Sequence, residues 1–339
     1  MPLGRVLNAQ DVEENKAVFN RIQGYSLVSH GRDYVWLALL QVRDRSPEGK
    51  AQLRRSLAEY GQGATPAYDL YQTFRGHLQA RQSTGEQKSP PPLVKAVGLS
   101  SSGYSLLAPD SGPPGKSFAN GFRKNFEDLI PNLPEDRYDA ILVLAGDDPQ
   151  AQLPAEQREI ESRFGDRAAI TWEQGTAKMQ NGIFREHFGF RDGISQPVFF
   201  EENLPPGDPA RRAWDPSASL SYVLTREPGT SNGSEFGSHL AFLKIRQDRR
   251  AFEEIARQAA LYVSPSVSPE TIQEWMMGRK INGDPLVPAG SDQDDFNYQS
   301  DRDFRLCPAA SHVRKMNPRT AEGRGKRVFR RSPVAKTAS

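Results

Sequence analysis

The sequence has 339 residues, and its 44 lysine and arginine side chains nearly balance 42 aspartate and glutamate side chains, which leaves a net charge of +2. This balance argues against a nucleic-acid partner, no apolar run approaches the ~18 residues of a membrane span, and the single cysteine cannot form an internal disulfide. Because the polar opening residues do not form the core of a signal peptide, the sequence predicts a cytoplasmic protein without a membrane partner.

The first part of the chain predicts strands and helices in alternation. Residues 34–42 form a nearly continuous apolar run of β-forming residues, which is typical of a strand covered on both faces. Residues 51–60 place Leu53, Leu57 and Tyr60 on one stripe of a helix. Further strands are expected at 94–99, 138–146 and 168–177, and a further helix at 155–164. The order strand, helix, strand, strand, helix, strand is that of a ferredoxin-like unit.

Three polar segments predict less regular structure. Residues 1–20 predict a short helix or an ordered arm. Residues 81–92 end in three prolines and predict a surface loop. Residues 201–237 are rich in proline, glycine, aspartate and serine and predict a long irregular connection.

A second set of elements follows this connection. Residues 238–245 have the alternation and content of a strand, and residues 251–262 predict an amphipathic helix. Ser268 followed by Pro269 starts another helix, which Gly278 ends. From 320 to 339 the sequence offers only one short apolar pair, at 328 and 329, so the second set is expected to be incomplete.

Residues 184–200 surround the carboxylate of Asp192 with aromatic residues. Gly189 and Gly193 flank this acid and allow the backbone to approach a flat group closely. A dry setting disfavours the charged form of a carboxylate, as in many general acids and bases. From the Gly-x-x-Asp-Gly spacing alone, a turn capped by Asp192 is the alternative. Five phenylalanines are expected to form the apolar walls: Phe184, Phe188, Phe190, Phe199 and Phe200.

Two long motifs carry a family resemblance. Residues 186–197, Glu-His-Phe-Gly-Phe-Arg-Asp-Gly-Ile-Ser-Gln-Pro, resemble the signature of the dye-decolourising peroxidase family of haem proteins. Residues 307–319, Cys-Pro-Ala-Ala-Ser-His-Val-Arg-Lys-Met-Asn-Pro-Arg, resemble the proximal haem segment of that family. A weaker similarity extends from about residue 23 to about residue 331.

The resemblance implies an α+β fold of two ferredoxin-like halves, the dimeric α+β barrel type. The first half would span 1–200 and end in the Asp192 loop, and an irregular connection would span 201–237. The second half would span 238–339, contain the proximal segment and be truncated at its C-terminus. The chain as given is therefore expected to hold haem weakly and to self-associate as a homo-oligomer.

The resemblance also implies a haem peroxidase that uses hydrogen peroxide to oxidise bulky phenolic or dye-like reductants, with one haem b per chain. His312 would be the axial iron ligand and Asp192 the distal acid/base. Arg330, eighteen residues after His312, would stabilise negative charge during cleavage of the peroxide bond. Haem contacts are expected from Gly193, Ile194, Ser195, Arg314, Asn317, Pro318, Arg319 and Arg330, with Arg314 and Arg319 as partners of the propionates.

Several alternatives stay open at this point. Cys307 could supply a thiolate ligand, Arg331 could replace Arg330, and residues 323–331 could form a basic tail. A surface residue could pass electrons from a bulky reductant, and the candidates are Tyr222, Trp275 and Tyr298. Two other functions compete with the enzyme: a non-catalytic haem-binding remnant of such a peroxidase, and a basic-tailed interaction protein without haem.

Overall fold

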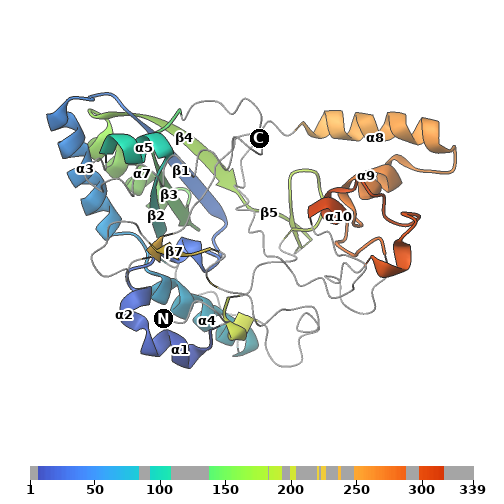
Figure 1. Cartoon of the computed structure of the whole chain (residues 1–339), viewed down its shortest axis with the longest axis horizontal. Coiled ribbons are helices and arrows are strands. Elements are labelled where there is room, and N and C mark those ends of the chain that lie inside the picture. Colours follow the sequence, from blue (N-terminus) through green and yellow to red (C-terminus); the bar gives the residue numbers. More distant parts are fainter. Residues whose placement is uncertain are drawn as a thin grey trace.

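The sheet of the first half has the strand order of a ferredoxin-like unit (Figure 1). Four antiparallel strands follow one another in the order β2-β3-β1-β4. They are β1 (Tyr34–Val42), β2 (Val94–Leu99), β3 (Ala140–Gly146) and β4 (Ala168–Thr176). The predicted strands are confirmed, with ends that differ by at most two residues. This computed structural model describes residues 7–83, 92–107, 137–181, 183–192, 199–203, 220, 223–226, 236–237, 248–287 and 298–316.

Strand β1 is apolar along its length because both faces of the sheet are covered. Successive side chains of a strand point to opposite faces. Val35 and Leu37 therefore join one hydrophobic cluster, whereas Trp36 and Ala38 join another. In register, Ala38 of β1 lies opposite Leu142 of β3 and Trp172 of β4.

Three helices cover the face that carries Trp36. They are α3 (Pro47–Gln62), α7 (Gln152–Phe164) and α5 (Ser101–Leu107). Ser46 caps α3, since its side chain accepts a hydrogen bond from the N–H of Gly49, and a proline follows at the first helical position. The predicted stripe of α3 is confirmed, because Leu53, Leu57 and Tyr60 are all buried.

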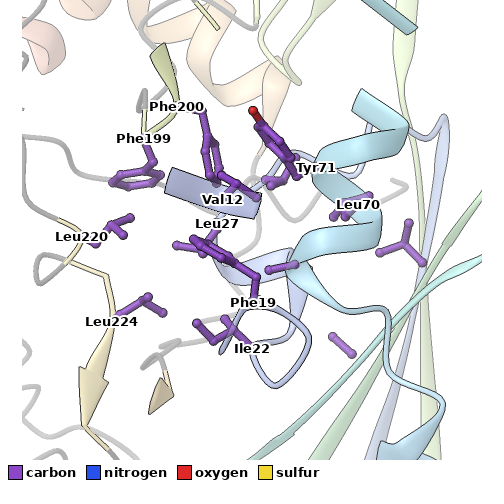
Figure 2. Packing of buried hydrophobic residues seen from close by; sticks show 14 of the residues in the cluster. Val12, Phe19, Ile22, Leu27, Leu70, Tyr71, Phe199, Phe200, Leu220 and Leu224 are labelled. Atoms are coloured by element: carbon purple, nitrogen blue, oxygen red, sulfur yellow. The ribbon is translucent and has the colours of Figure 1, made fainter. Parts of the chain in front are cut away.

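The opposite face is covered by α1 (Ala9–Glu14), α2 (Lys16–Phe19), α4 (Ala67–Ser83) and the 3-10 turn η1 (Gly24–Ser26). Figure 2 shows Phe19, Tyr71 and Phe200 in the middle of this cluster. The rings of Tyr71 and Phe200 are 4.7 Å apart. Of the expected helix or arm at 1–20, the described residues 7–20 contain two short helices.

Helix α4 was not predicted from the sequence, and the expectation of a loop from residue 81 is wrong at its start. The helix extends to Ser83. Its buried residues Leu70 and Tyr71 are followed by mostly polar sequence, so the helix depends on packing that local pattern does not reveal. The rest of the expected loop, from 84 to 91, lies outside the described residues.

The remaining described elements are short, apart from two helices near the C-terminal end. The hairpin strands β5 (Lys178–Gln180) and β6 (Ile183–Arg185) pair with each other, as do β7 (Thr225–Arg226) and β8 (Phe236–Gly237). The 3-10 turns are η3 (Glu201–Asn203) and η6 (Gln299–Asp301). The helices are α8 (Arg249–Val263), α9 (Pro269–Met277) and the single turn α10 (His312–Met316).

Helices α8 and α9 confirm the two helices predicted at 251–262 and from Ser268 to Gly278, whereas the strand expected at 238–245 lies outside the described residues. Ser268 caps α9 by accepting a hydrogen bond from the N–H of Thr271, and Gly278 ends it with a left-handed φ of 90°. Within the part of the chain that the structure describes, no helix combines the length and apolar character needed to cross a membrane.

Candidate active site

His312 is an exposed residue between two buried neighbours in the sequence. It is the first residue of α10 and is exposed, whereas Ser311 is 1% exposed and Val313 is 7% exposed. The N–H of Ser311 donates to the carbonyl of Pro308 at 3.0 Å, which closes the preceding turn. Among the described residues, none hydrogen-bonds to the imidazole ring of His312. The backbone is thus held on both sides while the ring stays accessible.

A buried ion pair fixes this segment from behind. Asp301 is 4% exposed, and its carboxylate accepts hydrogen bonds from the backbone N–H groups of Leu306 and Cys307, each at 2.9 Å. Nη1 of Arg314 donates to the same carboxylate at 2.8 Å and to the carbonyl of Cys307 at 2.6 Å, and Nη2 donates to the carbonyl of Asp301 at 2.8 Å. The guanidinium lies 4.5 Å from the ring of Tyr298 and 4.4 Å from that of Phe304. Arg314 therefore ties α10 to the chain around η6.

Cys307 is placed as a core residue. Its side chain is fully buried with Val287, Tyr298 and Val313. Its sulfur lies 3.0 Å from the hydroxyl of Ser311. A buried thiol within this cluster cannot reach a cofactor without opening the cluster, so the geometry favours a structural role over a thiolate ligand.

The Asp192 loop is built around Glu186. The two carboxylate oxygens of Glu186 accept hydrogen bonds from the N–H groups of Phe188 at 2.9 Å and Phe190 at 2.7 Å. Gly189 sits between them with a φ of 99°, a conformation that favours glycine. The N–H of Asp192, which is half-buried, donates to the carbonyl of Phe184 at 2.8 Å. These hydrogen bonds fix the backbone conformation from Phe184 to Asp192.

Arg185 connects this loop to the residues that follow α9. Its Nη1 donates to the carbonyl of Gly189 at 2.8 Å and to the carbonyl of Ile281 at 3.0 Å. The N–H of Arg191 donates to the carbonyl of Ile281 as well, at 3.0 Å. The rings of Phe188 and Phe252, which belongs to α8, are 4.7 Å apart.

Two expectations about aromatic residues are wrong. Phe199 and Phe200 do not wall the Asp192 loop, because they are buried in the cluster that packs on α1, α2 and α4 (Figure 2). Tyr298 is only 5% exposed, so it cannot serve as a surface electron donor. Trp275 is half-buried against α8, and Tyr222 lies outside the described residues.

The structure describes only part of the predicted site. Asp192, His312 and Arg314 are described, and the last of these uses its guanidinium within the protein. In the described part of the chain, no cluster of three or more His, Cys, Asp or Glu side chains is arranged to hold a metal ion. The other predicted residues lie outside the described ranges: Gly193, Ile194, Ser195, Asn317, Pro318, Arg319 and Arg330.

Sequence reasoning missed three residues that shape the site: Arg185, Glu186 and Asp301. Glu186 lies inside the aromatic motif, two residues before Phe188 and four before Phe190. At this spacing a carboxylate can accept hydrogen bonds from the backbone N–H groups of a turn, so its role could have been predicted from the sequence. Arg185 and Asp301 act over 96 and 13 residues respectively, and no local pattern indicates their partners.

The chain is similar in sequence to several peroxidases. It is 31% identical over 280 residues to the multifunctional dye peroxidase DyP2 of Amycolatopsis sp., which covers 75% of this chain and 59% of that protein. It is 26% identical over 261 residues to the dye-decolorizing peroxidase AauDyP1 of Auricularia auricula-judae, which covers 68% of this chain and 50% of that protein. The aligned part thus spans 59% and 50% of these two curated relatives. No protein-family model matches the chain.

Solved structures of similar proteins share the fold. The DyP-type peroxidase AnaPX of Anabaena sp. superposes with a TM-score of 0.74 at 24% identity, covering 93% of this chain and 71% of that one. DyP2 from Amycolatopsis sp. superposes with a TM-score of 0.71 at 27% identity, covering 95% of this chain and 71% of that one. Together with the observed strand order, these superpositions confirm the expected ferredoxin-like α+β fold.

Proposed function

The chain belongs to the dye-decolourising peroxidase family, and from this premise we propose that it is a haem enzyme that uses hydrogen peroxide to oxidise bulky phenolic or dye-like reductants. The observation that carries the proposal is that the segments of Asp192 and His312, far apart in the sequence, both contact residues 278–281. Ile281 accepts hydrogen bonds from the first segment, and Gly278 packs against the second. Residues 278–281 thus connect the segment of the proposed acid/base carboxylate to the segment of the proposed axial imidazole, which supports the two roles.

The described residues fit a haem. A neutral imidazole is a usual proximal donor to haem iron, and His312 offers an exposed ring on a backbone held by buried neighbours. When bound, haem b would supply the redox chemistry. A propionate would be held by Arg319, with further contacts to the haem from Gly193, Ile194, Ser195, Asn317, Pro318 and Arg330. Because the guanidinium of Arg314 is already bound to Asp301, its contribution would be to place His312.

The proton movements fall to Asp192. Its carboxylate would accept a proton from one oxygen of hydrogen peroxide and return it to the other oxygen, which leaves as water. Glu186 keeps the loop in shape for this step, because both of its oxygens are bound by backbone N–H groups. Arg330 would stabilise the negative charge that develops as the peroxide bond breaks. The proposed class of reductant is supported by the similar proteins, which are a dye peroxidase and a dye-decolorizing peroxidase.

Titration with hemin tests the cofactor. The wild-type chain should bind one haem, seen as a Soret band, and His312→Ala should lose most of this binding. His30→Ala is the matched control, since His30 belongs to the first half and its Nδ1 accepts the N–H of Arg32. A full Soret band in His312→Ala would assign the ligand to another residue, and no band in the wild type would leave an interaction protein without haem.

Peroxide turnover tests the role of Asp192. Asp192→Asn should slow the reaction with peroxide by about a hundredfold or more, the usual contribution of a general acid/base, and leave the haem content unchanged. Asp166→Asn, at an exposed carboxylate in the turn before β4, should keep the wild-type rate. An equal rate in Asp192→Asn would contradict the role, and haem binding without turnover in the wild type would identify a non-catalytic remnant.

A further inference from the structure

Residues 278–285 form the turn that follows α9, hereafter the α9 turn. Its first residue, Gly278, is in close contact with the segment of His312. Gly278 has a φ of 90°, and its N–H donates to the carbonyl of Glu274 at 2.6 Å. A Cβ atom placed on Gly278 would lie 2.9 Å from the hydroxyl oxygen of Ser311 and 3.2 Å from the Cβ of Val313. Since these two residues flank His312, the end of α9 packs directly against the backbone segment that carries the imidazole.

The same turn holds the Asp192 loop a few residues later. The carbonyl of Ile281 accepts hydrogen bonds from Nη1 of Arg185 and from the N–H of Arg191, both at 3.0 Å. Arg191 directly precedes Asp192, and Arg185 also binds the carbonyl of Gly189 within the loop. The carbonyl of Ile281 therefore holds the Asp192 loop together with Glu186 and with the hydrogen bond from the N–H of Asp192 to the carbonyl of Phe184.

The α9 turn is itself fixed by α9 and by internal hydrogen bonds. The N–H of Ile281 donates to the carboxylate of Glu274 at 3.2 Å. The N–H of Lys280 donates to the carbonyl of Asp284 at 2.8 Å, and the N–H of Gly283 donates to the carbonyl of Lys280 at 2.9 Å. Only three residue steps separate Gly278 from Ile281, at most about 11 Å of chain, so a displacement at one end reaches the other.

We propose that the α9 turn is the shared support that sets the spacing between the acid/base aspartate and the axial histidine. Arg185 is the positioning residue for Asp192, and Gly278 is the positioning residue for the segment of His312. The catalytic role of this spacing rests on the proposed function. The structural role of the α9 turn, which holds both segments, does not depend on it. A displacement of about 1 Å in a reacting group can cost about a hundredfold in rate, so the turn controls catalysis without touching a reactant.

The first experiment compares two glycine variants by amide hydrogen exchange of the haem-free protein. Gly278→Ala adds a methyl group that meets Ser311 and Val313, and it should reduce protection both at 186–192 and at 306–314. Gly31→Ala is the matched control, because Gly31 also has a positive φ, of 61°, but a Cβ there would meet nothing within 4 Å. It should reduce protection in neither segment. Reduced protection at 306–314 alone would overturn the proposal.

The second experiment separates the two ends of the support and stands even if Gly278→Ala fails to fold. Arg185→Met should reduce protection at 186–192 only, and in the haem-loaded protein it should slow the reaction with peroxide by about ten- to a hundredfold. Haem content and the spectral signature of the axial histidine should stay unchanged. Arg43→Met is the control, since Nη1 of Arg43 donates to a backbone carbonyl of the first half, that of Gly165, at 3.1 Å.

The results separate this inference from the proposed function. If the wild type binds no haem, the proposed function fails, and the exchange data alone decide whether the α9 turn supports both segments. If the wild type is an active peroxidase but Arg185→Met keeps both the wild-type exchange and the wild-type rate, the positioning role of Arg185 is wrong. In Arg185→Lys, the rate and the protection should lie between those of Arg185→Met and wild type. Such a result supports a positioning role, because lysine can donate to the same carbonyls but with a less suitable geometry.

Discussion

At the scale of single residues, Asp301 shows how a buried charge is accommodated near the candidate site. Burial raises the pKa of Asp301, but the backbone N–H groups of Leu306 and Cys307, together with Arg314, outweigh this effect and hold the pKa below its ordinary value. The charged group that faces Asp301 among the described residues is Arg314. Its carboxylate is therefore ionised in the folded protein under all but strongly acidic conditions.

Removal of Arg314 is predicted to destabilise the protein in a pH-dependent way. Arg314→Met leaves a buried carboxylate without its cation, a change that typically costs about 3–5 kcal/mol. Because the pKa of Asp301 is depressed in the folded state, the contribution of the pair is complete above the unfolded pKa of about 3.9 and is lost as the pH falls through the lower folded pKa. Urea unfolding from pH 7 to pH 3 should show the difference from wild type shrinking at the acid end.

An exposed ion pair on α8 provides the control for this prediction. Arg257 and the hydrogen-bonded Gln258 lower the pKa of Glu254 to about 2, yet both side chains of the ion pair are exposed to solvent. Solvent screens such pairs, and many contribute nothing measurable to stability. Arg257→Met should therefore keep the wild-type unfolding midpoint at every pH. A pH-independent loss in Arg314→Met would show that the pairing with Asp301 is not its cause.

At the scale of elements, two helical glycines differ in what surrounds them. Gly103 of α5 lies against the backbone of Asp139, and a Cβ there would collide with the carbonyl of that residue. Gly61 of α3 has only Val97 nearby, 3.9 Å from the position of a Cβ. The first glycine lets α5 approach the start of β3, whereas the second has no such role.

Substitution by alanine should therefore have opposite effects at these two positions. Gly103→Ala should destabilise the first half by about 1–3 kcal/mol, the usual cost of overpacking a core. Gly61→Ala should stabilise it by up to about 1 kcal/mol, because alanine has the higher helix propensity and no neighbour has to move. Urea unfolding followed by circular dichroism measures both changes. Equal losses in the two variants would mean that the close approach of α5 to Asp139 is not what requires glycine.

At the scale of the whole molecule, the sheet of the first half and helices α8 to α10 are connected through the Asp192 loop. Arg185 and Arg191 bind Ile281, and Phe188 packs on Phe252 of α8. The described segments before and after residue 200 therefore share contacts at the candidate site. A ligand bound there should stabilise the folded chain as a whole.

Hemin is predicted to raise the unfolding midpoint of the chain through His312. A ligand that binds only the folded state stabilises it by about 2.7 kcal/mol when its free concentration is a hundred times the dissociation constant. The wild type and His30→Ala should show this shift on addition of hemin, whereas His312→Ala should show little of it at the same concentration. Thermal unfolding followed by circular dichroism provides the measurement. An equal shift in all three would place the haem elsewhere on the chain.

The sequence by itself predicted the elements whose signals are local. The apolar run of β1, the stripe of α3 and the cap and terminal glycine of α9 each lie within a few residues, so periodicity and capping chemistry reveal them. The two haem-family motifs are likewise continuous stretches of chain. The order of these elements was enough to predict the ferredoxin-like arrangement, because few topologies fit that order.

Only the tertiary structure decided which residues meet. Helix α4 packs through its own Tyr71 against Phe200, and Phe199 and Phe200 lie in the core of the first half rather than at the expected wall of Asp192. Arg314 binds Asp301, and Arg185 reaches Ile281 across 96 residues of sequence. Contacts of this kind have no periodic signature, because their energy depends on burial and geometry that exist only after the chain has folded.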